Sequence, residues 1–187
     1  MKIGITGSLA SGKTTASKIL AKKRGPLFSA DSVVKDLYQN PYFKSLISKT
    51  FKIKNNKRIK SSLKKIILDN KKNITSLENI IHPLVRRRMK NFSSIHKRKK
   101  FIFYEIPLLI ESKLMKYFNI IIFIKANRKI RLKRFKSKLG NEKLFKLLDS
   151  KQFSDKKKTK ICDHVVVNEK NLKILKKKLS AIMRNYE

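Results

Sequence analysis

Residues 7 to 14 read Gly-Ser-Leu-Ala-Ser-Gly-Lys-Thr and match the pattern G-x-x-x-x-G-K-[ST]. The apolar run 2–6 before them predicts a β-strand, and the segment from Lys13 onward, with Ala16 and Leu20 on one face, predicts an α-helix. Between a strand and a helix, glycines let the backbone approach a phosphate closely, and the N–H groups of the helix N-terminus face it with positive partial charge. The pattern therefore predicts a phosphate-binding loop.

The side chains and backbone of this loop predict separate contributions to binding a nucleoside triphosphate. Lys13 supplies a full positive charge at the β- and γ-phosphates, and the Thr14 hydroxyl is the expected ligand of Mg²⁺. The residues expected around the phosphates are Gly7, Ala10, Ser11, Gly12, Lys13, Thr14 and Thr15.

The remaining apolar runs predict an α/β fold of the phosphate-loop type. Further short strands are expected at 26–29, 101–106, 120–124 and 165–167. Apolar runs without polar alternation are typical of parallel strands that helices bury on both faces. We therefore expect one domain, 1–187, with a five-stranded parallel sheet, helices on both faces, a helical insert at 32–92 and a helical lid at 127–160. Ligands of such folds bind at the carboxyl edge of the sheet.

The charge of the chain is strongly positive, with 49 Lys and Arg against 12 Asp and Glu, or a formal net charge of +37. The lysines are spread almost evenly, which indicates a general compositional bias rather than a nucleic-acid interface, so no specific nucleic-acid partner is expected. A non-catalytic nucleic-acid-binding protein remains an alternative, favoured by the charge and by the run 86–88 of three arginines.

Two features predict a cytoplasmic protein without a membrane partner. The longest nearly apolar stretch, 101–110, contains Glu105 and is about half the length that a membrane-spanning helix needs. The single cysteine, Cys162, excludes an internal disulfide and is compatible with a reducing compartment.

Asp31 follows the second predicted strand and is the candidate catalytic acid-base group. A carboxylate at that position is suited to orient an acceptor hydroxyl and to take its proton. The alternative is that Asp31 only caps the next helix.

Arg128, Arg131 and Arg134 have helical i, i+3, i+6 spacing, which predicts that they share a face of the lid. The chain contains no N-K-x-D guanine signature, and its length favours a small-molecule kinase over a motor ATPase.

Along nearly its whole length the chain resembles the dephospho-coenzyme A kinase family. The resemblance is carried by the phosphate loop, Ser29-Ala30-Asp31, the Leu-Glu and His-Pro of 77–83, Glu-Ile-Pro-Leu-Leu-Ile-Glu at 105–111, Arg131 to Arg134, Gln152, and Asp-His-Val-Val-Val-Asn at 163–168. Ser29 stands where the family has a first Asp.

The resemblance implies transfer of the γ-phosphate of ATP to the ribose 3′-hydroxyl of dephospho-coenzyme A, the last step in making coenzyme A. It implies that Asp31 is the catalytic carboxylate, Lys13 the phosphate lysine and Arg134 the lid arginine. It places His82 and Pro83 in the substrate-binding insert, where the alternative is a His-Pro turn that only positions two helices.

Two more roles follow from the resemblance and the fold class. Asn168 follows the last strand, where the adenine of ATP lies in folds of this class. Glu105 either assists the Mg²⁺ shell through water or only terminates its strand. The remaining alternative is another phosphate-loop kinase that acts on a nucleoside or nucleotide, although residues 29–36 lack the arginines that would grip a monophosphate.

Overall fold

The computed structural model describes residues 1–54, 59–70, 72–139 and 141–187. The chain forms two compact units, Met1–Ser29 with His96–Glu187, and Ala30–Ile95. The expected insert at 32–92 lies in the second unit, and its residues 55–58 and 71 are outside the described residues. The expected lid at 127–160 lies in the first unit, and its residue 140 is likewise outside them.

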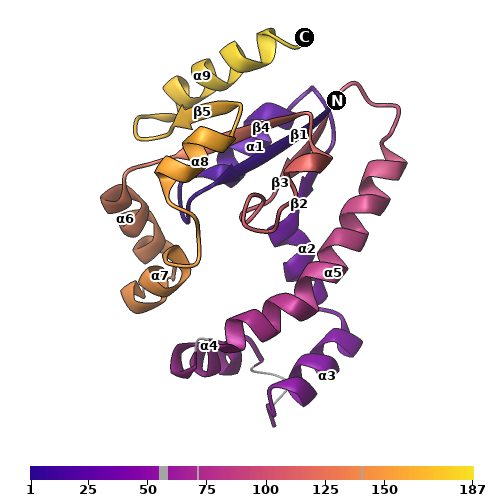
Figure 1. Cartoon of the computed structure of the whole chain (residues 1–187), viewed down its shortest axis with the longest axis vertical. Helices are drawn as coiled ribbons and strands as arrows, with labels where there is room; N and C mark the ends of the chain where they lie inside the picture. The colour runs from indigo at the N-terminus through magenta and orange to yellow at the C-terminus, as the bar shows by residue number, and fades with distance from the viewer. Residues whose placement is uncertain (55–58, 71, 140) are drawn as a thin grey trace. The chain divides into compact units, whose positions relative to one another are not determined.

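The first unit is built on a five-stranded parallel sheet with the order β2-β3-β1-β4-β5 (Figure 1). Its strands are β1 (Lys2–Gly7), β2 (Leu27–Ser29), β3 (Ile102–Glu105), β4 (Ile120–Lys125) and β5 (His164–Val167). The predicted fold class is confirmed, and every strand end lies within one residue of its predicted position. The strands could be predicted from the sequence because apolar side chains occupy both faces of the central strands, which gives continuous apolar runs.

Helices connect and follow the strands of this sheet. The helices are α1 (Lys13–Ala21), α6 (Arg128–Leu139), α7 (Glu142–Asp149), α8 (Asp155–Ile161) and α9 (Leu172–Arg184), with a short 3₁₀ helix η2 (Met115–Tyr117). α1 and α9 pack together over one face (Figure 1), where Ile5, Leu20 and Leu179 are fully buried. The next residues along the strands face the other side, where the Tyr104 ring packs edge-on against Phe118 at 5.3 Å between centroids.

The second unit is helical throughout its regular elements: α2 (Ala30–Leu37), α3 (Pro41–Thr50), α4 (Ile59–Asp69) and α5 (Lys72–Ile95). Asn40 caps α3 by accepting a hydrogen bond from the Phe43 N–H at 3.1 Å. Phe43, Ile47 and Leu63 form the centre of its small apolar core. No helix in the described part of the chain, α5 included, is both long and apolar enough to cross a membrane.

The alternative interpretation of His82 and Pro83 as a turn between two helices is wrong, because α5 continues through both residues. Proline has no N–H, so the carbonyl of Asn79 lacks its usual helical hydrogen bond. Packing offsets this loss, since Ile81 and Leu84 on either side of the pair contact the apolar core of the unit.

Candidate active site

The predicted phosphate loop connects β1 to α1 at the carboxyl edge of the sheet. The loop bends sharply, with positive φ angles at Ala10 (59°) and Gly12 (94°). The Ser11 N–H donates to the Ser8 carbonyl at 3.0 Å, which closes the bend. Because α1 begins at Lys13, the first N–H groups of this helix have no partner within the helix and belong to the loop. The backbone therefore has the form that an anion requires.

Two glycines of the motif are required by the space around them. A Cβ on Gly7 would lie 2.5 Å from the carbonyl oxygen of Ile124 in the neighbouring strand. A Cβ on Gly12 would lie 2.3 Å from Asn168 Nδ2, and the φ of 94° disfavours any side chain there. A larger residue at either position would displace the loop.

Lys13 is folded back over the loop. Its side chain is buried, with the residue 8% exposed, and its ammonium donates to the Ser8 carbonyl at 3.3 Å. This position concentrates a positive charge beside the backbone amides of the loop, where the anion of a nucleotide would be bound. Thr15 is exposed in the first turn of α1.

Thr14 and Glu105 bring a hydroxyl and a carboxylate together beside the loop. The Thr14 hydroxyl donates to Glu105 Oε1 at 2.5 Å. Glu105 is the last residue of β3 and is 1% exposed, and its Oε2 has no hydrogen-bond partner among the described residues. A buried carboxylate oxygen without a donor costs free energy, so it requires a partner that the protein itself does not supply.

Arginines of α6 reach the carbonyl groups of the loop. The buried guanidinium of Arg131 donates to the Leu9 carbonyl at 3.3 Å and to Asp149 at 2.6 Å. Arg134, one turn later, donates to the Ser11 carbonyl at 3.3 Å. Arg128 pairs with Asp149 at 3.4 Å and is 56% exposed. Because Arg131 is buried and paired with Asp149, Arg134 is the freer of these two arginines to reach a phosphate.

Other side chains reach the loop from segments distant in the sequence. Gln152 Oε1 accepts from the Leu9 N–H at 2.9 Å, and Asp155 accepts from the Ser8 hydroxyl. Asn168 donates from Nδ2 to the Ser11 carbonyl at 2.8 Å and is 8% exposed. The expectation that Asn168 lies beside the adenine stays a prediction, and in the structure its amide holds the loop. Sequence reasoning did not foresee this contact. It missed Asp155 altogether, and the only available signal was the scarcity of acids, 12 in the whole chain.

The other predicted site residues belong to the second unit. Asp31 is exposed in the first turn of α2, which begins at Ala30, so the interpretation of Asp31 as an N-cap is wrong. Burial lowers the pKa of His82, the Glu78 carboxylate opposes this shift, and Arg86 adds to it. The His82 ring is therefore neutral near pH 7 and presents one donor and one acceptor. Pro83 is exposed on α5.

A parallel sheet, a phosphate loop with a buried lysine, and arginines reaching that loop from a helical segment define a phosphate-loop kinase.

Comparison with known proteins shows which family of phosphate-loop kinases the chain resembles. The family model for dephospho-CoA kinase matches residues 1–173. The chain is 35% identical to the dephospho-CoA kinase of Bartonella quintana, covering 98% of this chain and 96% of that protein. It is also 35% identical to the enzyme of Fusobacterium nucleatum, covering 96% and 95%. The chain belongs to the dephospho-CoA kinase family.

Solved structures agree with this membership. Dephospho-CoA kinase from Campylobacter jejuni superimposes with a TM-score of 0.68 at 25% identity, covering 99% of this chain and 97% of that one. TT1252 from Thermus thermophilus has the same fold, with a TM-score of 0.81 at 23% identity, covering 100% and 98%. As a member of the family, the chain is a kinase that transfers phosphate from ATP to dephospho-CoA, the final step of coenzyme A biosynthesis.

Proposed function

We propose that the chain phosphorylates the ribose 3′-hydroxyl of dephospho-CoA, with Asp31 as the general base. The observation that carries the proposal is the phosphate loop with its buried lysine, in a chain that belongs to this kinase family. The place of Asp31 in the chain supports its role. Ser29 of β2 is in register with Glu105 of β3, and Asp31 follows two residues later with an exposed side chain.

The residues divide the chemistry between them. Asp31 accepts the proton of the ribose hydroxyl as its oxygen attacks the γ-phosphorus, and the bond from that phosphorus to the oxygen bridging it to the β-phosphorus breaks to release ADP. Lys13 and the loop N–H groups stabilise the charge that develops on the phosphoryl oxygens. Arg134 adds a second positive charge when its guanidinium leaves the Ser11 carbonyl for a phosphate.

We assign the unit Ala30–Ile95 to binding of dephospho-CoA and residues 127–160 to a lid over the nucleotide. His82 and Pro83 serve substrate binding, and the neutral ring of His82 offers a hydrogen bond without charge. The contacts of Arg131, Arg134 and Gln152 with the loop support the assignment of the lid. Phosphoryl transfer requires that water be excluded from the site, and groups that close over the loop exclude it.

Thr14 and Glu105 fit a magnesium ion bound with the nucleotide. Their oxygens are the hard ligands that Mg²⁺ prefers, and the free Oε2 of Glu105 is suited to accept from a water of its shell. The described residues contain no group of three or more His, Cys, Asp or Glu able to hold a metal. This agrees with an ion held largely by phosphates and water. When bound, Mg²⁺ neutralises charge on the phosphates.

Glu105→Gln is expected to raise the Mg²⁺ concentration for half-maximal activity by about tenfold or more, because the ion loses a carboxylate that orients its shell. The measurement is a Mg²⁺ titration of the initial rate at fixed ATP. Glu169→Gln is the control, since Glu169 lies just after β5 of the same sheet and accepts from the Asn127 N–H at 2.8 Å. An unchanged titration of Glu105→Gln would mean that Glu105 only terminates its strand.

The proposed reaction is tested with ATP, Mg²⁺ and dephospho-CoA. We expect one ADP for each product, a product heavier by one phosphoryl group, and a ³¹P resonance coupled to the ribose 3′ position. A 3′-deoxy analogue of dephospho-CoA should give no product, and adenosine and AMP should be far poorer acceptors. If adenosine were phosphorylated as efficiently as dephospho-CoA, the chain would be a nucleoside kinase instead.

A further inference from the structure

Lys158 of α8 is a fully buried charge. It is 0% exposed, and its ammonium forms an ion pair with Glu111 Oε1 at 2.9 Å. Beyond this pair, neither the ammonium nor Glu111 Oε2 has a hydrogen-bond partner among the described residues, and Phe123 lies under the ammonium at 6.0 Å. Each charge is therefore compensated mainly by the other. Apolar pairs of similar volume are often as stable as a buried ion pair or more stable, so a buried ion pair is weak evidence for a role in stability.

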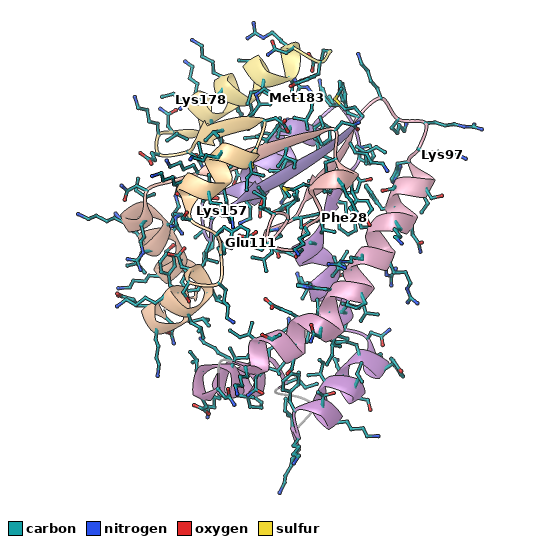
Figure 2. The ribbon with its side chains drawn as sticks, in the orientation of Figure 1. Phe28, Lys97, Glu111, Lys157, Lys178 and Met183 are labelled. Atoms are coloured by element: carbon teal, nitrogen blue, oxygen red, sulfur yellow. The ribbon has the colours of Figure 1, made fainter. Side chains whose placement is uncertain are left out.

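Glu111 also holds the start of α8. Its Oε1 accepts from the Phe153 N–H at 2.9 Å, just before Ser154, whose hydroxyl caps the helix. One carboxylate oxygen therefore fixes the chain at two points, Phe153 and Lys158, on either side of the first turn of α8. Figure 2 shows Glu111 beside this helix, close to the labelled Lys157.

The segment held in this way carries two of the contacts to the phosphate loop. Gln152 directly precedes Phe153 and accepts from the Leu9 N–H at 2.9 Å. Asp155 lies one turn before Lys158 and accepts from the Ser8 hydroxyl. A shift of α8 and of the segment before it would break both contacts together, because a hydrogen bond tolerates only a small change in the distance between its donor and acceptor.

We infer that Glu111 and Lys158 are a positioning pair of the nucleotide site, which holds Gln152 and Asp155 against the phosphate loop. Neither side chain of the pair contacts a reacting group. The pair acts through α8 on the shape of the loop, and so on ATP rather than on the acceptor. The inference rests on the kinase activity proposed above.

Lys158→Met should raise KM for ATP by about tenfold, leave KM for dephospho-CoA within about twofold, and lower kcat less than threefold. Gln152→Ala should have a similar effect on KM for ATP. If the pair acts through Gln152, the double variant Lys158→Met/Gln152→Ala should be no worse than the stronger single variant. Multiplied effects in the double variant would overturn the inference.

A second variant separates positioning from loss of folding, since Lys158→Met leaves the buried Glu111 carboxylate without its cation. Glu111→Gln/Lys158→Met removes both charges, keeps an acceptor for the Phe153 N–H and fills the space with an apolar chain. Its melting temperature should stay within a few degrees of the unaltered protein, and its KM for ATP should remain raised by about fivefold or more. A folded double variant with the original KM for ATP would show that the pair is only structural.

The control is Arg24→Met, which removes the cation of another ion pair in the same unit, between the partly exposed Arg24 and Glu187. Its KM values should not change, because exposed pairs contribute little. If the unaltered protein itself failed to phosphorylate dephospho-CoA, the proposed function would fail. If it were active and the pair variants matched it in KM for ATP, only the present inference would fail.

Discussion

Asp31→Asn is expected to lower kcat by about a hundredfold or more, because the amide keeps the size of the carboxylate but has no basic oxygen for the ribose proton. Binding of ATP should be retained, since the proposed ATP contacts, namely the loop at 7–15, Arg134 and Asn168, do not include Asp31. The measurements are steady-state kinetics with dephospho-CoA and calorimetric titration with a non-hydrolysable ATP analogue.

The matched control is Asp36→Asn, the same change on the same helix α2, also at an exposed position. It should leave kcat unchanged. Asp31 also lies in the first turn of α2, where a negative charge stabilises a helix by about 0.3–1 kcal/mol, and loss of that stabilisation lowers the melting temperature without lowering kcat. A fall in kcat of less than tenfold would contradict the assignment of Asp31 as the base.

Lys13→Met is expected to lower kcat/KM for ATP by about a thousandfold, because the ammonium that stabilises the transferring phosphoryl is lost from a buried site. Methionine has a similar length and suits the buried position, so the fold should be retained, as a melting curve will show. ADP binding should weaken less than the chemical step, because the loop N–H groups remain.

Lys18→Met is the control for this change. Lys18 lies on the same helix α1 but is exposed in its last turn, so only the general positive field is reduced there. Its kcat/KM should stay within about twofold, in keeping with the small effect of one exposed charge. A Lys13→Met variant that kept a tenth of the original kcat/KM would exclude the proposed phosphate contact.

The sheet and the loop could be predicted because their signals are local. The apolar runs of β3 and β4 favour strands buried on both faces, and the loop is a contiguous motif between a strand and a helix. Pro83 was harder, since proline usually ends a helix. Here the helix continues because its neighbours are anchored in the core of the second unit, and no local rule contains that information.

The part of the candidate site that lies in the phosphate loop could also be predicted, because its signal is local. Lys13 and Thr14 follow directly from the motif, whereas the role of Asp31, expected from the strand before it, stays a prediction. No local pattern predicts the contact of Asn168 with the Ser11 carbonyl or that of Asp155 with the Ser8 hydroxyl. The two partners are 157 positions apart in the first contact and 147 in the second. The side chains of Asn168 and Asp155 meet the loop because β1, β4 and β5 are parallel neighbours, which brings segments that follow distant strands to one edge.

By itself, the amino-acid sequence determined the strands, the phosphate loop and the class of chemistry, because hydrophobic periodicity and a short glycine motif act over a few residues. Only the tertiary structure decided which groups hold that loop in place, namely Gln152, Asp155 and Asn168, and that a buried Glu111–Lys158 pair anchors the helix bearing Asp155. Such contacts depend on how helices and strands far apart in the chain pack together. A buried charge such as that of Lys158 needs a partner, and packing alone determines which residue becomes that partner.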